Sequence, residues 1–326
     1  MIDLHCEKNI SVAPMMAWTD RHCRYLLRLT SQRVRLFTEM ITTGALLHGP
    51  RDRLLAYHED EHPVVIQLGG SEPGPMAECA KMAADHGYDE ININVGCPSP
   101  RVQRGAFGAC LMKEPALVAE LVAAMSAATS VPVTVKCRLG VDEVDDQESL
   151  EDFVGAVTEA GCGTLYLHAR KALLSGLSPA QNRQIPPLQY DRAYGIKQTF
   201  PHLNVMLNGG ITDLDAAAEH LTRVDGIMIG RQAYQQPLFM NDLAVAHLGE
   251  EPVTALTVMQ GYMSYMRAEL DNGTRLADMT RHCLGLFTGM PGARHFRRLL
   301  SDHKRLAAND LALVGEALDQ VLARAA

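Results

Sequence analysis

The ends of short apolar runs in this chain carry residue types that commonly bind ligands. They are Met15, Met16, Glu39, Gln67, Asn92, Asn94, Cys97, Lys136, Arg138, His168, Arg170, Asn208, Gly209, Gly210, Gly230 and Arg231. A polar group inside an apolar segment costs free energy unless it is paired. One or two such groups can pair within a protein interior, whereas this many at equivalent positions favours a bound ligand.

Two glycine-containing run ends indicate a phosphate site. Asn208, Gly209 and Gly210 follow one run, and Gly230 with Arg231 follows the next. Glycine lets backbone N–H groups approach phosphate oxygens, and an arginine adds a positive charge. These glycines could instead form tight turns only, but the arginine that follows directly favours phosphate.

Three further residues at run ends could bind a ring that belongs to the same ligand as the phosphate. Lys136 and His168 lie on successive runs and can face one electron-rich, anionic ring, while Gln67 can bond an amide-like edge. Together with the phosphate site, these groups describe a bound FMN. A phosphosugar, with Lys136 forming a Schiff base as in an aldolase, is the alternative that remains open at this point.

Cys97 is the one cysteine whose position indicates chemistry. It stands just beyond an apolar run and before Pro98, in a segment that also carries Arg101 and Arg104. A thiol with an ordinary pKa of about 8.5 is mostly protonated at neutral pH and can donate a proton. The other cysteines are interpreted as small hydrophobic residues.

Eight β-branched runs organise these residues. They lie at residues 10–16, 33–40, 63–70, 90–97, 132–140, 164–170, 204–211 and 226–231. The runs recur about every 31 residues, the length of one βα unit, and helical patterns occupy the intervals. This predicts an α/β protein with a (β/α)8 TIM barrel, whose strand ends gather the ligand-binding residues at one face. A doubly wound open sheet is the alternative, weakened because no G-x-G-x-x-G follows the first run.

The pattern changes near residue 243. We expect residues 1–243 to form the barrel and residues 244–326 to form a separate, entirely helical domain. One predicted helix in that domain, 293–307, is basic, since Asp302 is its only acid. An irregular segment, 171–190, follows the sixth run, and long loops of this kind are usually functional.

Composition and charge exclude several classes of protein. With 47% hydrophobic and 21% charged residues among 326, the chain is globular. A net charge of −8 argues against a generally basic nucleic-acid coat. The eight cysteines form no C-x-x-C pair, which disfavours zinc ribbons and predicts free thiols in a reducing compartment. Without a signal pattern or a membrane-length apolar run, we expect a cytoplasmic protein.

Several stretches resemble the tRNA-dihydrouridine synthases, and within them the DusA type. The most specific are GCPSPRVQRGAFGACLM from residue 96 and HARKALLSGLSPAQNR from residue 168; SVAPMMAWTDRHCRYL, PVTVKCRLG and GARHFRRLLSDH also match. The resemblance covers residues 10–305. It implies a barrel that holds FMN, a helical domain that helps bind tRNA, NADPH as reductant and D-loop uridines as substrate. We expect a monomer without metal or membrane attachment.

The resemblance also implies roles for individual residues. It implies FMN contacts for Pro14, Met15, Met16, Gln67, Lys136, His168, Asn208, Gly209, Gly210, Gly230 and Arg231. It implies contacts with uracil or RNA for Asn94, Arg170, Asn182, Arg183, Arg294 and Arg297. The implied reaction yields 5,6-dihydrouridine, with hydride passing from FMN N5 to uracil C6 and a proton from Cys97, the catalytic residue, to C5.

Two positions depart from the family pattern, and other functions stay open. Ala17 stands where the family often has Asp, and Pro100 stands where a polar residue is common. A small-molecule FMN oxidoreductase, of the dihydroorotate dehydrogenase or ene-reductase kind, would keep FMN and the proton donor without RNA. A non-catalytic RNA-binding protein is disfavoured by the many polar run ends.

Overall fold

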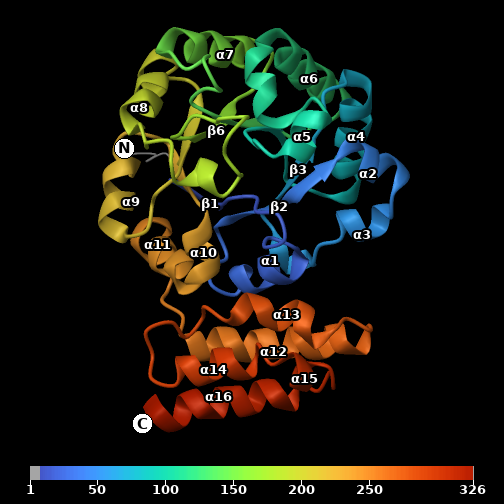
Figure 1. Cartoon of the computed structure of the whole chain (residues 1–326), viewed down its shortest axis with the longest axis vertical. Helices are drawn as coiled ribbons and strands as arrows, with labels where there is room; N and C mark the ends of the chain where they lie inside the picture. The colour runs from blue at the N-terminus through green and yellow to red at the C-terminus, as the bar shows by residue number, and fades with distance from the viewer. Residues whose placement is uncertain (1–7, 326) are drawn as a thin grey trace, which may run out of the picture. The chain divides into compact units, whose positions relative to one another are not determined.

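Eight parallel strands form the centre of the structure, a computed structural model that describes residues 8–325 (Figure 1). Cys6 and most of the segment inspected for a signal pattern lie outside these residues. The strands are β1 (Asn9–Val12), β2 (Arg35–Thr42), β3 (Val64–Gly69), β4 (Glu90–Val95), β5 (Val133–Arg138), β6 (Thr164–His168), β7 (Asn204–Asn208) and β8 (Gly226–Ile229). They pair in sequence order and β8 closes onto β1. The predicted (β/α)8 barrel is confirmed, and the open-sheet alternative is wrong.

The chain divides into two compact units. Among the described residues, the first contains 8–16, 35–57 and 62–230, and the second contains 17–34, 58–61 and 231–325. The second unit therefore combines the C-terminal segment with two short segments from the N-terminal part of the chain. The predicted division at residue 243 stays a prediction.

Proline and glycine mark the ends of several helices in the first unit. Around the barrel lie α4 (Pro73–His86), α6 (Pro115–Ala128), α7 (Gln147–Glu159), α8 (Tyr190–Thr199) and α9 (Leu214–Leu221), as Figure 1 shows. Proline occupies the first turn of α4 and of α6, where no N–H is needed. Gly87 ends α4 in the left-handed region, with φ of 100°. Shorter helices are α2 (Thr43–His48), α3 (Arg51–Leu55) and α5 (Pro100–Arg104).

Apolar side chains fill the barrel interior on the N-terminal side of the strand ends that carry the ligand-binding residues. Ala13, Phe37, Val65, Tyr166, Met206 and Met228 form one buried cluster there. The outward faces of the strands pack against the surrounding helices in a larger core, so most strands are apolar on both faces. The interior cluster closes the barrel below its C-terminal end, and the ligand-binding residues gather above it.

The second unit is helical. It contains α1 (Arg21–Arg28), α10 (Arg231–Gln235), α11 (Leu238–Leu248), α12 (Ala255–Asp271), α13 (Leu276–Cys283), α14 (Ala293–Leu299), α15 (His303–Leu306) and α16 (Ala312–Ala325). The predicted single helix over 293–307 is wrong. The Asp302 side chain accepts hydrogen bonds from the backbone N–H groups of Lys304 and Arg305 and starts α15 as a separate helix.

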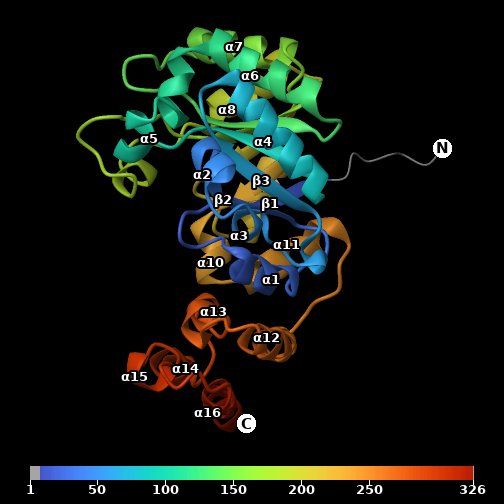
Figure 2. The same cartoon turned by 90° about the vertical axis from the view of Figure 1, so that its right-hand side faces the viewer.

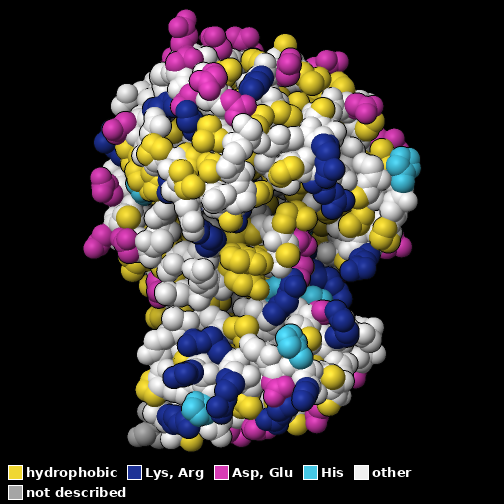
Figure 3. All heavy atoms as spheres, in the orientation of Figure 1, with side chains coloured by type: hydrophobic (Ala, Val, Ile, Leu, Met, Phe, Trp, Pro, Cys, Tyr) yellow, Lys and Arg dark blue, Asp and Glu magenta, His cyan; other side chains and the backbone are white. Residues whose placement is uncertain are grey.

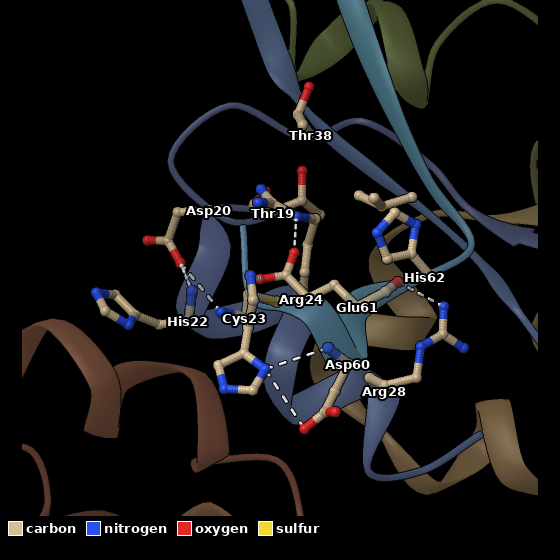
Figure 4. Close-up of polar contacts among 12 residues, drawn as sticks. Thr19, Asp20, His22, Cys23, Arg24, Arg28, Thr38, Asp60, Glu61 and His62 are labelled. Atoms are coloured by element: carbon tan, nitrogen blue, oxygen red, sulfur yellow. Dashed lines mark hydrogen bonds and ion pairs between the residues drawn. The ribbon is translucent and has the colours of Figure 1, made fainter. Parts of the chain in front are cut away.

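A buried ion pair holds the segment 58–61 onto α1 within this unit. The Arg24 Nε atom lies 2.6 Å from Glu61 Oε2, and both side chains are almost fully buried (Figure 4). Arg28 adds a hydrogen bond of 2.9 Å to the Glu61 carbonyl oxygen. Such a pair is costly to break, because removal of one partner leaves a buried, uncompensated charge.

Candidate active site

The strand register brings the predicted ring-binding residues together at the C-terminal end of the barrel. Lys136 pairs with Asn94 across β5 and β4, and His168 pairs with Asn208 across β6 and β7. The Lys136 Nζ atom donates to Asn208 Oδ1 over 3.2 Å. Asn94 Nδ2 donates to Gln67 Oε1 over 2.8 Å. Five neighbouring strands, β3 to β7, thus supply polar groups at one end of the barrel.

Burial sets the protonation states of the two basic groups in this set. Burial, with the nearby Arg138, lowers the pKa of Lys136 to about 8, so its amine is cationic at neutral pH but titrates close to it. Burial and the same guanidinium lower the pKa of His168 well below its ordinary value, so its imidazole is neutral. The site therefore offers one ammonium and one neutral imidazole to a ligand.

The loop after β7 forms a cradle of backbone N–H groups. Gly209 and Gly210 both have left-handed backbones, with φ of 117° and 76°. A Cβ at Gly209 would lie 2.7 Å from His168 Cδ2, so a side chain there would collide with the site. Within residues 8–325, the N–H groups of Gly209, Gly210 and Gly230 have no hydrogen-bond partner. Successive unpaired N–H groups of this kind suit phosphate oxygens.

Gly230 distinguishes the two interpretations of these glycines. A Cβ built there meets nothing within 4 Å, and its φ is not left-handed. The fold therefore does not require glycine at this position, whereas a ligand that approaches the backbone would. Arg231, which follows directly, is exposed and begins α10 in the second unit.

Pro14, Met15 and Met16 follow the C-terminal end of β1. Pro14 and Met15 are half-buried, and Met16 is 61% exposed. Hydrophobic side chains line much of the hollowed barrel end that faces the viewer in Figure 3. A flexible, polarizable methionine side chain that is exposed after a barrel strand is available for contact with a flat ligand.

Cys97 lies on a loop whose backbone is bonded by the Asn94 side chain. The backbone N–H groups of Cys97 and Gly96 donate to Asn94 Oδ1 over 3.0 and 3.2 Å. The Cys97 carbonyl accepts from the Ala109 N–H over 3.0 Å, which closes the loop around α5. Burial raises the pKa of the half-buried Cys97 thiol above its ordinary value. The thiol therefore keeps its proton at neutral pH and can act as an acid.

Arg138 connects this loop to the segment after β6, a function that the sequence did not reveal. Its buried guanidinium donates to the carbonyl oxygens of Gly96 (2.8 Å), Lys171 (3.1 Å) and Asn182 (3.1 Å). Gln103 adds a hydrogen bond of 2.8 Å to the Leu174 carbonyl. Figure 2 shows α5 and the segment 171–190 projecting from the same end of the barrel. The two loops are thus one bonded layer at the rim.

Three residues predicted to contact RNA lie in the segment after β6. Asn182 is fully buried, and its side chain bonds both the N–H and the carbonyl of Leu173, over 2.8 and 2.9 Å. Arg170 is half-buried and donates to the carbonyl oxygens of Gln184 and Pro186, while Arg183 is exposed. The structure thus gives Asn182 and Arg170 a part in shaping the loop. Their contact with RNA stays a prediction, and Arg183 is the accessible one of the three.

Arg294 and Arg297 are exposed on α14 of the second unit. Arg298, Lys304 and Arg305 are exposed on the same stretch of chain, and Figure 3 shows Lys and Arg side chains gathered over these C-terminal helices. Arg305 is paired with Glu316. The local charge is positive although the net charge of the chain is −8.

The two departures from the family pattern have distinct local consequences. Ala17 adopts a left-handed backbone with φ of 61°, a conformation that Asp or Asn tolerates better than Ala. Pro100 occupies the first turn of α5, where its fixed φ suits a helix start. Pro100 therefore stiffens the Cys97 loop without a lost hydrogen bond, whereas Ala17 introduces mild strain.

Neither a metal centre nor a membrane segment is evident in residues 8–325. No three His, Cys, Asp or Glu side chains there converge as metal ligands do. None of the helices there combines the length and the hydropathy that a bilayer crossing demands.

Comparison with known proteins gives the family. The sequence profile of the dihydrouridine synthase (Dus) family matches residues 11–324. A tRNA-dihydrouridine(20/20a) synthase of Vibrio cholerae is 54% identical over 316 residues, covering 96% of each chain. One of Escherichia coli K12 is 52% identical over 322 residues, covering 98% of this chain and 93% of the relative.

A solved structure supports the fold alone. Morphinone reductase, as a variant in complex with tetrahydroNAD, has a TM-score of 0.54 and 12% identity, covering 73% of this chain and 87% of that one. The sequence relatives span nearly the full chain at more than half identity. The chain therefore belongs to the dihydrouridine synthase family and is an enzyme of that family.

Proposed function

We propose that this enzyme reduces uridine in the D-loop of tRNA to 5,6-dihydrouridine, with FMN bound in the barrel and NADPH as reductant. The single observation that carries the proposal is the Cys97 thiol. It is protonated, and its loop is held by Asn94 at the same barrel end as the phosphate cradle and Lys136. Membership of the family and the names of the relatives support the substrate.

The donor set fits FMN. The N–H groups of Gly209, Gly210 and Gly230 would bind the phosphate. The Lys136 ammonium would stabilise negative charge on the ring, and Gln67 would bond its amide-like edge. The reduced flavin, once bound, supplies hydride to the substrate.

The pyrimidine chemistry on the protein side belongs to Cys97 and Asn94. Uracil C5=C6 is conjugated with the C4 carbonyl, so a hydride adds at C6 and a proton at C5. The Cys97 thiol donates that proton. Asn94 has its Oδ1 occupied by two backbone N–H groups. It therefore holds the Cys97 loop in place, and any contact it makes with the uracil edge is through its amide N–H.

A tRNA must present its uridine turned out of the base stack, since a stacked base cannot reach the barrel end. Arg183 at the rim, and Arg294 and Arg297 on α14, supply exposed positive charge for phosphate contacts. Such contacts position the RNA without reading its sequence, and they weaken with salt.

Substitution of Cys97 tests the proposal. In Cys97→Ala, NADPH should still reduce the flavin at the normal rate, whereas reduction of unmodified tRNA should fall by roughly 10²- to 10⁴-fold, the usual contribution of a positioned acid. Stopped-flow absorbance follows the flavin, and mapping of dihydrouridine follows the RNA. Cys97→Ser, with a weaker acid in the same place, is the control and should retain partial activity. Normal tRNA reduction by Cys97→Ala would refute the role of the thiol, and a wild-type protein that binds no flavin would refute the function.

A further inference from the structure

A continuous chain of side-chain hydrogen bonds runs from the Cys97 loop through the barrel interior. Below Asn94, the Gln67 Nε2 atom donates to Asn92 Oδ1 over 2.8 Å. The Asn92 Nδ2 atom donates to Thr134 Oγ1 over 2.9 Å. The Thr134 hydroxyl donates to Glu90 Oε1 over 2.7 Å. The chain crosses β3, β4 and β5 and ends at a carboxylate near the start of β4.

The polarity of this chain is fixed at both of its ends. At the top, backbone N–H groups can only donate, so Asn94 must present its oxygen to Cys97 and its NH₂ to Gln67. At the bottom, a carboxylate can only accept, so the Thr134 hydrogen points to Glu90 and the hydroxyl oxygen must accept from Asn92. The requirement set by Glu90 passes through Asn92 and Gln67 to Asn94, where it agrees with the requirement set by the backbone N–H groups. Each link is buried, where a reversed amide would leave two unsatisfied groups.

Glu90 is held as an acceptor by partners outside the chain. The Arg35 Nη1 atom lies 3.1 Å from Glu90 Oε2, and the Tyr166 hydroxyl donates to the same oxygen over 3.3 Å. Burial raises the pKa of Glu90, and the Arg35 guanidinium beside it opposes that rise. The competing acceptor for Thr134, the Ile91 carbonyl, lies at 3.5 Å, so the 2.7 Å bond to Glu90 determines where the hydrogen points.

We propose that Glu90, acting through Thr134, is a positioning residue for the site: it fixes the amide orientations of Asn92, Gln67 and Asn94, and so the backbone of the Cys97 loop. The inference rests on the proposed function for its catalytic consequence but not for its structural one. Glu90 is the first residue of β4, at the strand end opposite to the Cys97 loop, so it acts through other residues. Asn94 bonds the Cys97 loop and Gln67 bonds Asn94, so the chain determines which of their amide groups remain for a ligand.

Thr134→Val tests the inference because it removes the hydroxyl that joins Asn92 to Glu90, and with it two hydrogen bonds, while both neighbours stay in place. Valine has nearly the same shape, so the protein should fold, while Asn92 loses its acceptor and Glu90 keeps Arg35 and Tyr166. We expect the backbone N–H groups of Gly96 and Cys97 to exchange with solvent faster by about five- to tenfold, the effect expected when their hydrogen bonds to Asn94 weaken by about the worth of one buried hydrogen bond. Amide exchange measured by NMR on the purified protein reads this without any turnover. Thr134→Ser keeps the hydroxyl and should restore slow exchange.

Tyr166→Phe is the matched control, since it removes a hydrogen bond to Glu90 that lies outside the chain. It should leave exchange at Gly96 and Cys97 unchanged. Equal acceleration in Thr134→Val and Tyr166→Phe would mean general loosening and would overturn the inference, as would unchanged exchange in Thr134→Val. With unmodified tRNA and saturating NADPH, Thr134→Val should lower the rate of tRNA reduction more than it raises KM. A wild-type protein that does not reduce tRNA would refute the proposed function, while the exchange result would still decide the role of Glu90.

Discussion

Replacement of Gly230 by alanine separates a ligand cradle from a simple turn. The Cβ of Gly230→Ala would point into space with no protein atom within 4 Å, and the backbone there is not left-handed. Folding should therefore be unaffected or stabilised by up to about 1 kcal/mol, because alanine restricts the unfolded chain. If the phosphate of FMN rests on this backbone, the added methyl group occupies the space of the ligand.

The expected loss of affinity follows from the hydrogen bonds that the methyl group displaces. A hydrogen bond to a charged group contributes about 1.5–3 kcal/mol, and each 1.4 kcal/mol is tenfold in affinity. Displacement of the phosphate from one N–H group should thus weaken FMN binding by roughly tenfold to a hundredfold. Titration of the flavin-free protein with FMN, followed by flavin fluorescence, measures this.

Gly209→Ala provides the contrasting result within the same cradle. Its φ of 117° and the 2.7 Å approach to His168 predict a direct cost to folding, about 1–3 kcal/mol for the backbone alone. Urea denaturation should show this loss in Gly209→Ala and none in Gly230→Ala. A destabilised Gly230→Ala, or one that binds FMN normally, would refute the assignment of Gly230 to a phosphate site.

Three other predictions concern charge. In the flavin-free protein, FMN affinity should fall by up to about fivefold between pH 8 and pH 9. Burial lowers the pKa of Lys136 to about 8, and only its cation, present at lower pH, attracts the flavin. Lys136→Arg should abolish this dependence in the same titration. Glu61→Ala should lower the free energy of unfolding, measured in urea, by about 3–5 kcal/mol, because it leaves the buried Arg24 charge without its partner. Arg24→Met combined with Glu61→Leu should recover much of this loss. Arg294→Ala and Arg297→Ala should each lower the slope of log affinity for tRNA against log salt by about 1, as measured by filter binding, and an unchanged slope would exclude that residue from the interface.

The fold was predictable because each barrel strand is marked locally. Most of the eight runs are apolar on both faces, and several of the helices carry proline or an acidic cap at the start, as at Asp146 of α7 and Asp213 of α9. Parallel strands covered by helices leave few other arrangements. The candidate ligand-binding residues were predictable for a related reason: polar groups at strand ends stand out against an apolar background.

The parts that the sequence did not reveal depend on long-range partners. Asn182 is a polar residue in an irregular segment, which in sequence favours an exposed position. The structure buries it, with its side chain bonded to Leu173, and the sequence pattern does not show this contact. The break between α14 and α15 arises because Asp302 caps a new helix, and in sequence it resembles one acid within a basic helix. Arg138 was identified as a strand-end residue, but its bonds to two loops become visible only when those loops are adjacent.

Burial is the common cause behind the chemistry of this site. The same low-polarity surroundings move Lys136 toward neutrality, keep His168 uncharged and keep the Cys97 thiol protonated. Two of the three shifts favour the form that the proposed reaction needs, a neutral imidazole at His168 and a protonated acid at Cys97. The exception is Lys136, for which burial opposes the cation that the flavin needs. An anionic flavin favours the protonated form of Lys136 and so raises its pKa. Flavin binding and proton uptake by Lys136 should therefore be coupled.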